Sequence, residues 1–110
     1  MAIYMDGGTV TKAVAKASAG NVFAARVTNA NAALRYFQIH NKATAPAGTD
    51  VPVLSLPIPV SGGIMTIGSE FLSGDERACS LGVSWAISTT HATFTDSATA
   101  NEHTVTLKYG

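Results

Sequence analysis

The sequence predicts an all-β protein, an antiparallel β-sandwich or jelly-roll-like barrel of about seven to eight short strands. First, apolar residues alternate with polar or small residues in several short segments, most regularly in residues 80–89 and 103–109. Second, Gly, Pro, Asn and Asp residues separate these segments. The chain has 110 residues, the size of one domain. It shows no internal repeat of the kind that builds a solenoid.

The N-terminal region is expected to be an arm that leads into the domain. Residues 1–8 end in Gly7-Gly8 and are predicted to be flexible, which leaves residues 9–110 as a single β-sandwich domain. Residues 9–18 alternate as a strand does. Ala and Lys also favour a helix there, but the β-branched residues favour the strand.

The next segment is predicted to complete a hairpin. Ala19-Gly20-Asn21 is a turn signal, and residues 22–28 follow it with Phe23, Ala25 and Val27 on one face. We therefore expect residues 22–28 to pair with residues 9–18. The following residues 29–32 are predicted to form a loop, with a short helical turn as the alternative.

Residues 33–41 are predicted to be the third strand, and a loop over residues 42–50 follows it. The alternation points Phe37 and Ile39 inward and Tyr36, Gln38 and His40 outward. Residues 51–60 also alternate but include prolines 52, 57 and 59. Because proline has no N–H to donate to a ladder, this segment must be an edge strand or a strand broken between sheets.

The C-terminal half continues the same pattern. Ser61-Gly62-Gly63 predicts a turn, residues 64–67 a short strand, and the charged residues 68–79 a loop with one helical turn as an option. Residues 80–89 are predicted to be a strand with Leu81, Val83, Trp85 and Ile87 on its apolar face. A polar loop over residues 90–101 then leads to a terminal strand at residues 103–109, which we expect to be paired in a sheet.

Composition argues against several classes of function. Seven basic and seven acidic residues give a net charge of zero, so no field steers the chain onto nucleic acid or an anionic membrane. Such neutrality, with so few charges, favours a protein that packs against neighbours. Cys79 is the only cysteine, which excludes an internal disulfide and predicts a buried, inert thiol, as suits folding in a reducing cytoplasm. The N-terminus lacks the pattern of a signal peptide, and no apolar run is long enough for a membrane helix.

The residues that carry chemistry form no recognisable site. His40, His91 and His103 are far apart in sequence, and the lone Cys79 has no neighbouring ligand, so we expect no metal site. No nucleophile-elbow motif marks one hydroxyl, and the glycine pairs are turn signals and not phosphate loops. Hydrolase activity is therefore the least favoured reading. The prediction is a protein that is not an enzyme, with no catalytic residues and no cofactor.

One strand offers a candidate protein interface. Its residues are Arg35, Tyr36, Gln38 and His40, since Tyr and Arg are typical interface anchors. The alternative is that Tyr36 simply covers the edge of a sheet. Trp85, on an apolar strand face, is expected in the core and not on a binding platform.

Two phrases of the chain resemble small virion structural proteins of tailed bacteriophages. They are Ala33-Leu-Arg-Tyr-Phe-Gln-Ile-His-Asn-Lys-Ala-Thr-Ala-Pro46 and Gly82-Val-Ser-Trp-Ala-Ile-Ser-Thr-Thr90, with the closing Val105-Thr-Leu-Lys-Tyr109. The resemblance extends over about residues 20–110 and rests on structural motifs, so it transfers no functional residue. It implies a β-sandwich of the capsid decoration (cement) type, made in the host bacterial cytoplasm and located in the virion.

The resemblance also implies partners. These are the major capsid protein or other virion proteins, with a homo-oligomer expected and with no nucleic acid or membrane partner. A flexible arm over residues 1–8 would order by adding to a neighbour's sheet edge. The alternative is a tail or head-fibre component that acts as a receptor- or glycan-binding module, which would need exposed aromatic and amide side chains in a shallow pocket.

Overall fold

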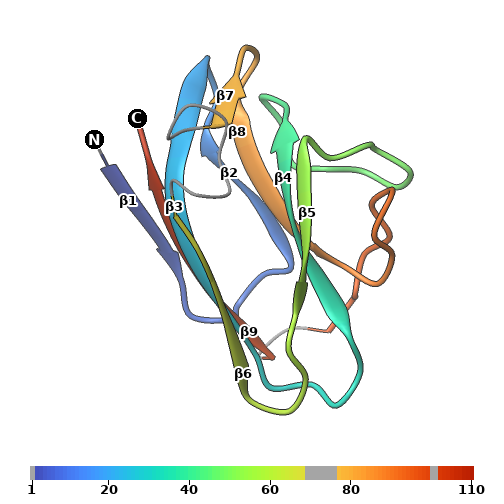
Figure 1. Cartoon of the computed structure of the whole chain (residues 1–110). Helices are drawn as coiled ribbons and strands as arrows, with labels where there is room; N and C mark the ends of the chain where they lie inside the picture. The colour runs from blue at the N-terminus through green and yellow to red at the C-terminus, as the bar shows by residue number, and fades with distance from the viewer. Residues whose placement is uncertain (1, 69–76, 100–101) are drawn as a thin grey trace.

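Two antiparallel β-sheets face each other in the computed structural model, which describes residues 2–68, 77–99 and 102–110 (Figure 1). Nine strands and no helix occur in these residues. The prediction of an all-β antiparallel sandwich is therefore confirmed. No helix able to cross a membrane occurs in the described part of the chain.

The first sheet, sheet A, contains five strands. Its main path runs β1 (Ala2–Asp6), β9 (His103–Tyr109), β3 (Gly20–Asn29) and β6 (Gly63–Ile67). The short β7 (Arg77–Cys79) also pairs with β3, beyond the end of β6. The terminal strand β9 lies in the interior of this sheet between β1 and β3, which confirms that it is paired.

The second sheet, sheet B, has four strands in the order β2 (Lys12–Lys16), β8 (Val83–Ser88), β4 (Arg35–Asn41) and β5 (Leu54–Ile58). The edge position predicted from the prolines is confirmed, because β5 pairs with β4 alone. The turn at Ser61 and Gly62 is also confirmed, with φ angles of 58° and 92°.

The core lies between the two sheets and follows the predicted alternation. Phe37 and Ile39 of β4 face it, as do Trp85 of β8 and Leu107 of β9, and all four are fully buried. The Trp85 ring stacks on Phe37 at 6.5 Å between centroids. Burial of each large side chain stabilises the fold by roughly 1.5–3 kcal/mol, so this layer holds the two sheets together.

The expectation of a flexible arm over residues 1–8 is corrected. Residues 2–6 form β1, which pairs with β9 over its whole length, and Tyr4 packs edge-on against Trp85 at 5.9 Å. Asp6 then fixes the turn that follows, because its carboxylate accepts hydrogen bonds from the Gly8 N–H (3.1 Å) and the Thr9 hydroxyl (2.8 Å). The Gly7-Gly8 pair is a tight turn, with Gly8 at a φ of 102°, and not a flexible joint.

The predicted hairpin between residues 9–18 and 22–28 is wrong. Strand β2 pairs with β8 in sheet B, whereas β3 belongs to sheet A, so the turn between them crosses the sandwich. Each of these two strands has an apolar side that packs into the core. The apolar side of β2 and that of β3 therefore face one another across the core, and the strands do not pair side by side. A register shift between Val22 and Ala24 also puts Val22 in the core in place of the predicted Phe23, which is only partly buried.

Two further boundaries differ from expectation. The charged segment was expected to be a loop over residues 68–79, but its last three residues form β7, and residues 69–76 lie outside the described part. Strand β8 starts at Val83, so Leu81 lies before it and is 63% exposed instead of inward. The predicted burial of Cys79 is confirmed, since its side chain is 1% exposed.

Candidate functional site

The four predicted interface residues lie on β4 but do not form one exposed surface. Arg35 is on the core-facing side of the strand with Phe37, and its Nε atom is buried without a partner. Tyr36 is half-buried beside His91, with ring centroids 5.1 Å apart. Gln38 and His40 point away from the core, as predicted, yet they are 0% and 2% exposed. The prediction of an open Tyr36, Gln38 and His40 face is therefore corrected.

Two loops cover this side of the sheet. Residues 42–52 and residues 89–99, which we call the covering loops, lie beside the outer face of sheet B (Figure 1). They are joined to one another, because the Phe94 N–H donates to the Asp50 carbonyl (2.7 Å) and the Thr49 N–H donates to the Phe94 carbonyl (2.9 Å). The Phe94 side chain is buried between the loops and the sheet.

The Gln38 amide ties the second covering loop to β4. Its Nε2 atom lies 3.0 Å from the Thr90 carbonyl oxygen, 3.2 Å from that of His91 and 3.1 Å from that of Thr93. Its Oε1 atom lies 3.0 Å from the Nε2 atom of His40. One buried amide thus satisfies polar groups of a loop more than fifty positions away in the chain.

Ser88, at the end of β8, is the second anchor of the same loop. Its hydroxyl has two carbonyl acceptors within reach, because Oγ lies 2.8 Å from the Thr90 oxygen and 3.2 Å from the Thr93 oxygen. The same oxygen accepts the N–H groups of Thr90 (3.1 Å) and Thr95 (3.0 Å). Serine at this position therefore saturates its hydrogen-bonding capacity on a single turn of backbone.

His40 is a buried imidazole under the covering loops. Its ring meets Phe94 edge-on, with centroids 6.0 Å apart. Burial lowers the pKa of His40, with Asp50 opposing this shift and Lys42 adding to it. Asp50 accepts hydrogen bonds from the Ala47 N–H (2.9 Å) and the Lys42 ammonium (2.6 Å), which lower its pKa. His40 is therefore held neutral as a packing and hydrogen-bonding group near neutral pH.

A second buried histidine lies at the opposite end of the sandwich. His103 is the first residue of β9 and is 4% exposed, and its Nε2 atom has no hydrogen-bond partner. Burial lowers its pKa, Glu102 opposes the shift, and the Arg35 charge adds to it. In the described part of the chain, no three His, Cys, Asp or Glu side chains gather as metal ligands.

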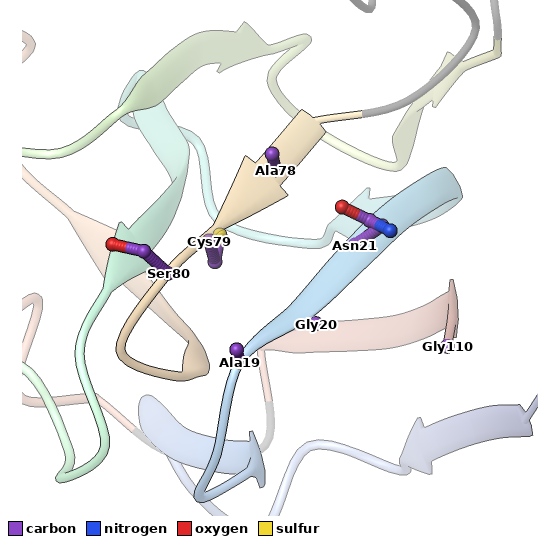
Figure 2. A pocket seen from close by; sticks show the side chains of 7 residues that line it. All are labelled: Ala19, Gly20, Asn21, Ala78, Cys79, Ser80 and Gly110. Carbon is purple, nitrogen blue, oxygen red and sulfur yellow. The ribbon is translucent and has the colours of Figure 1, made fainter.

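The hollows on the described surface differ in lining, and the one bordered by His40, Asn41, Lys42 and Asp50 lies at the ion pair and buried imidazole described above. Figure 2 shows one of about 340 Å³ between the start of β3, the end of β7 and Gly110. Small residues such as Ala19, Gly20 and Ala78 line it, and the buried Cys79 thiol lies beside it. Among the described residues that line it, no pair of groups acts as nucleophile and base. We therefore assign no chemistry to it.

The outer side of sheet A, which we call the open face, carries several exposed side chains among the described residues. The strand registers place its side chains in three rows across the sheet. The rows are Ile3–Lys108–Ala24, Met5–Thr106–Arg26–Thr66 and Thr104–Thr28–Ile64. None of these ten residues is acidic, and sequence analysis did not single them out because alternating Thr and Lys positions are also typical of any solvated strand.

The open face combines apolar, hydroxyl and basic groups. Ile3, Met5 and Ile64 are 57%, 75% and 59% exposed, which is high for large apolar side chains. Arg26 donates from Nε to the Thr66 hydroxyl at 3.3 Å, and with Lys108 it borders a hollow of about 150 Å³ over Ala24. The one ion pair between described residues is Lys42–Asp50, so neither cation of the open face has a carboxylate partner there.

Comparisons of the chain with family models, with curated proteins and with solved structures found no match.

Proposed function

We propose that this chain is a non-enzymatic bacteriophage virion structural protein, a capsid decoration (cement) protein that binds the assembled head and stabilises it. The resemblance of residues 33–46 and 82–90 to small phage virion proteins supplies the class. The open face of sheet A is the observation that carries the role, because large apolar side chains are exposed on it beside two cations that have no carboxylate partner among the described residues.

The open face supplies both affinity and orientation. Ile3, Met5 and Ile64 lie toward its two sides, and covering them removes apolar area from water at about 25 cal/mol per Å². Arg26 and Lys108 lie between them and require carboxylates on the partner, since desolvating an unpaired cation would oppose binding. The major capsid protein is the partner that this proposal names, with an acidic patch at the contact.

The mechanism is stabilisation by binding to the assembled state. A protein that binds the closed shell but not the separated subunits stabilises the shell. The stabilisation grows with the logarithm of the ratio between the concentration of the free binding protein and its dissociation constant from the shell. A contact that spans two capsid subunits exists only in the shell. The covering loops on the opposite side of the sandwich then face solvent, where their hydrogen-bonded polar groups need no partner.

The test uses heads of the encoding phage that lack this protein. Purified chain is added to them, and co-sedimentation and the temperature of head disruption are measured. We expect saturable binding that weakens with salt and a rise in the disruption temperature. No binding, or binding without any change in resistance to heat, would contradict the proposal.

Two charge-matched variants locate the contact. Lys108→Glu reverses a charge on the open face, whereas Lys16→Glu makes the same change on β2 of the other sheet. We expect Lys108→Glu to weaken head binding roughly tenfold or more and Lys16→Glu to leave it within about twofold. Equal effects of the two variants would refute the assignment of the contact to sheet A.

The alternative role, a receptor- or glycan-binding module of a tail or head fibre, is less well supported. Sugar recognition favours exposed aromatic side chains. The large apolar residues that are exposed in the described part of the chain are all aliphatic or Met, and Tyr36 is half-buried against His91. A glycan array probed with the purified chain distinguishes the two roles.

A further inference from the structure

The edges of the two sheets differ in how well they are protected against pairing with another strand. Sheet B is protected on both sides: β5 contains Pro57 and is followed by Pro59, and β2 carries Lys12 and Lys16 with a register shift between Val14 and Lys16. Prolines, lysines and bulges are the devices by which natural sheets prevent edge-to-edge association. The side of sheet A opposite β1 is not one continuous edge, because it is divided between the five-residue β6 and the three-residue β7.

Strand β1 has none of these devices. Its five residues, Ala-Ile-Tyr-Met-Asp, contain no proline and no lysine, and they pair with β9 without a register shift. No strand of the described chain lies on its other side. Its outward side chains, Ile3 and Met5, are exposed apolar groups, and its one charged residue, Asp6, already accepts two hydrogen bonds from its own turn.

We propose that β1 is a dimerisation edge that pairs in antiparallel orientation with β1 of a second copy of this chain. Full overlap of the five described residues places the twofold axis at Tyr4, so that Ile3 of each copy lies opposite Met5 of the other. Directly opposed apolar side chains stabilise an antiparallel pair, and Asp6 lies opposite the small Ala2. In this register no like charges lie opposite one another. Met5, the most exposed apolar side chain of the open face, becomes covered in both copies.

The size of the contact sets the expected affinity. A pair of five-residue strands is smaller than a standard stable interface of about 1,600 Å². The dimer should therefore be weak and concentration-dependent when the chain is free in solution. It joins two open faces into one continuous surface, on which two copies can each engage a partner, and such bivalent binding strengthens a weak contact. The pairing itself does not depend on the proposed function.

The register is tested by two double variants that remove the same apolar side chains. In Ile3→Lys/Met5→Lys, the introduced cations face one another across the twofold axis. In Ile3→Lys/Met5→Glu, each introduced cation faces an introduced anion of the other copy. Ile64→Lys, on β6 of the same open face, is the control. Sedimentation velocity is measured over a range of concentrations for each protein, with Trp85 fluorescence to verify the fold.

We expect the unmodified chain to be a reversible dimer with a dissociation constant below about 1 mM. The Lys/Lys variant should weaken it about tenfold or more, the Lys/Glu variant should retain it within about threefold, and Ile64→Lys should leave it unchanged. A chain that remains monomeric, two double variants that dissociate equally, or a control that dissociates as much as the Lys/Lys variant would each overturn the proposal.

A measurement without substitutions covers the case in which a variant does not fold. Amide hydrogen exchange of the unmodified chain at low and high concentration should show protection that rises with concentration in residues 2–6 and not in β5. Exchange in residues 2–6 that does not change with concentration overturns the pairing. Failure of head binding leaves these outcomes unaffected, so the two proposals fail separately.

Discussion

Replacement of Gln38 by methionine should release the second covering loop from the sheet. Methionine fills about the same volume but removes the amide, which lies within 3.2 Å of three backbone carbonyl oxygens of residues 90–93. The amide has two hydrogens, so two of these carbonyls lose a full partner, and His40 loses the Oε1 acceptor at 3.0 Å. At about 1 kcal/mol for each of these three hydrogen bonds, the loss is about 3 kcal/mol.

That loss is measurable in two ways. The free energy of unfolding from urea titration should fall by about 3 kcal/mol, which corresponds to a decrease in melting temperature of about 12 °C for a domain of this size. Hydrogen exchange should accelerate at the Phe94 and Thr95 amides, because these bond to Asp50 of the first covering loop and to Ser88 of β8.

A second substitution provides the comparison for Gln38→Met. Ser55→Ala removes a weaker contact of the same amide, at 3.4 Å from Nε2, and should cost less than about 0.5 kcal/mol. If Gln38→Met changes stability as little as Ser55→Ala does, the amide does not hold the loop. Loss of stability with unchanged exchange in residues 89–95 would likewise refute the reasoning.

Two other predictions concern the buried histidines and a close backbone contact. Burial lowers the pKa of both His40 and His103, so below about pH 6.5 the unfolded chain binds more protons than the folded chain. Stability should be complete above that pH and fall as the pH drops toward the lowered folded values, and urea titrations with equal midpoints at about pH 7.5 and 5 would contradict this. Gly82→Ala should cost about 1–3 kcal/mol, because its Cβ atom would lie 2.6 Å from the Lys42 carbonyl oxygen. Gly48→Ala, with no atom within 4 Å of its Cβ, should be neutral in the same thermal denaturation assay.

The architecture of the core could be predicted from the sequence because alternation reports directly on burial. The predicted inward residues Phe37, Ile39 and Trp85 are all buried, and the prolines around β5 identified an edge. The pairing of β2 was not predictable in the same way. Alternation marks which side of a strand is apolar, but two consecutive strands with apolar sides can pair side by side or face one another across a core.

The predicted exposure of Gln38 and His40 was wrong for a related reason. Period-2 alternation placed Gln38 and His40 correctly on the side away from the core, but it carries no information on whether a distant loop covers that side. One signal was available: Phe94 is a large apolar residue within a polar loop, and its burial requires that this loop fold back onto the sheet. The open face was missed because Thr, Lys and Arg on alternate positions have the same appearance whether they meet water or a partner.

The two sides of the sandwich differ in where their polar groups find partners, and this difference determines where binding free energy is available. On sheet B, the buried amide of Gln38 and the hydroxyl of Ser88 bond to loop carbonyls, and Lys42 pairs with Asp50. A partner that docked there would have to compete with bonds already made, and it would gain little. On sheet A, Arg26 and Lys108 have no carboxylate partner among the described residues. The apolar side chains beside them are exposed to water. A complementary partner surface would therefore gain binding free energy both from burying these side chains and from pairing the two cations. Because β1 forms the boundary of this same face, pairing of two copies through β1 would enlarge the surface on which such gains are available.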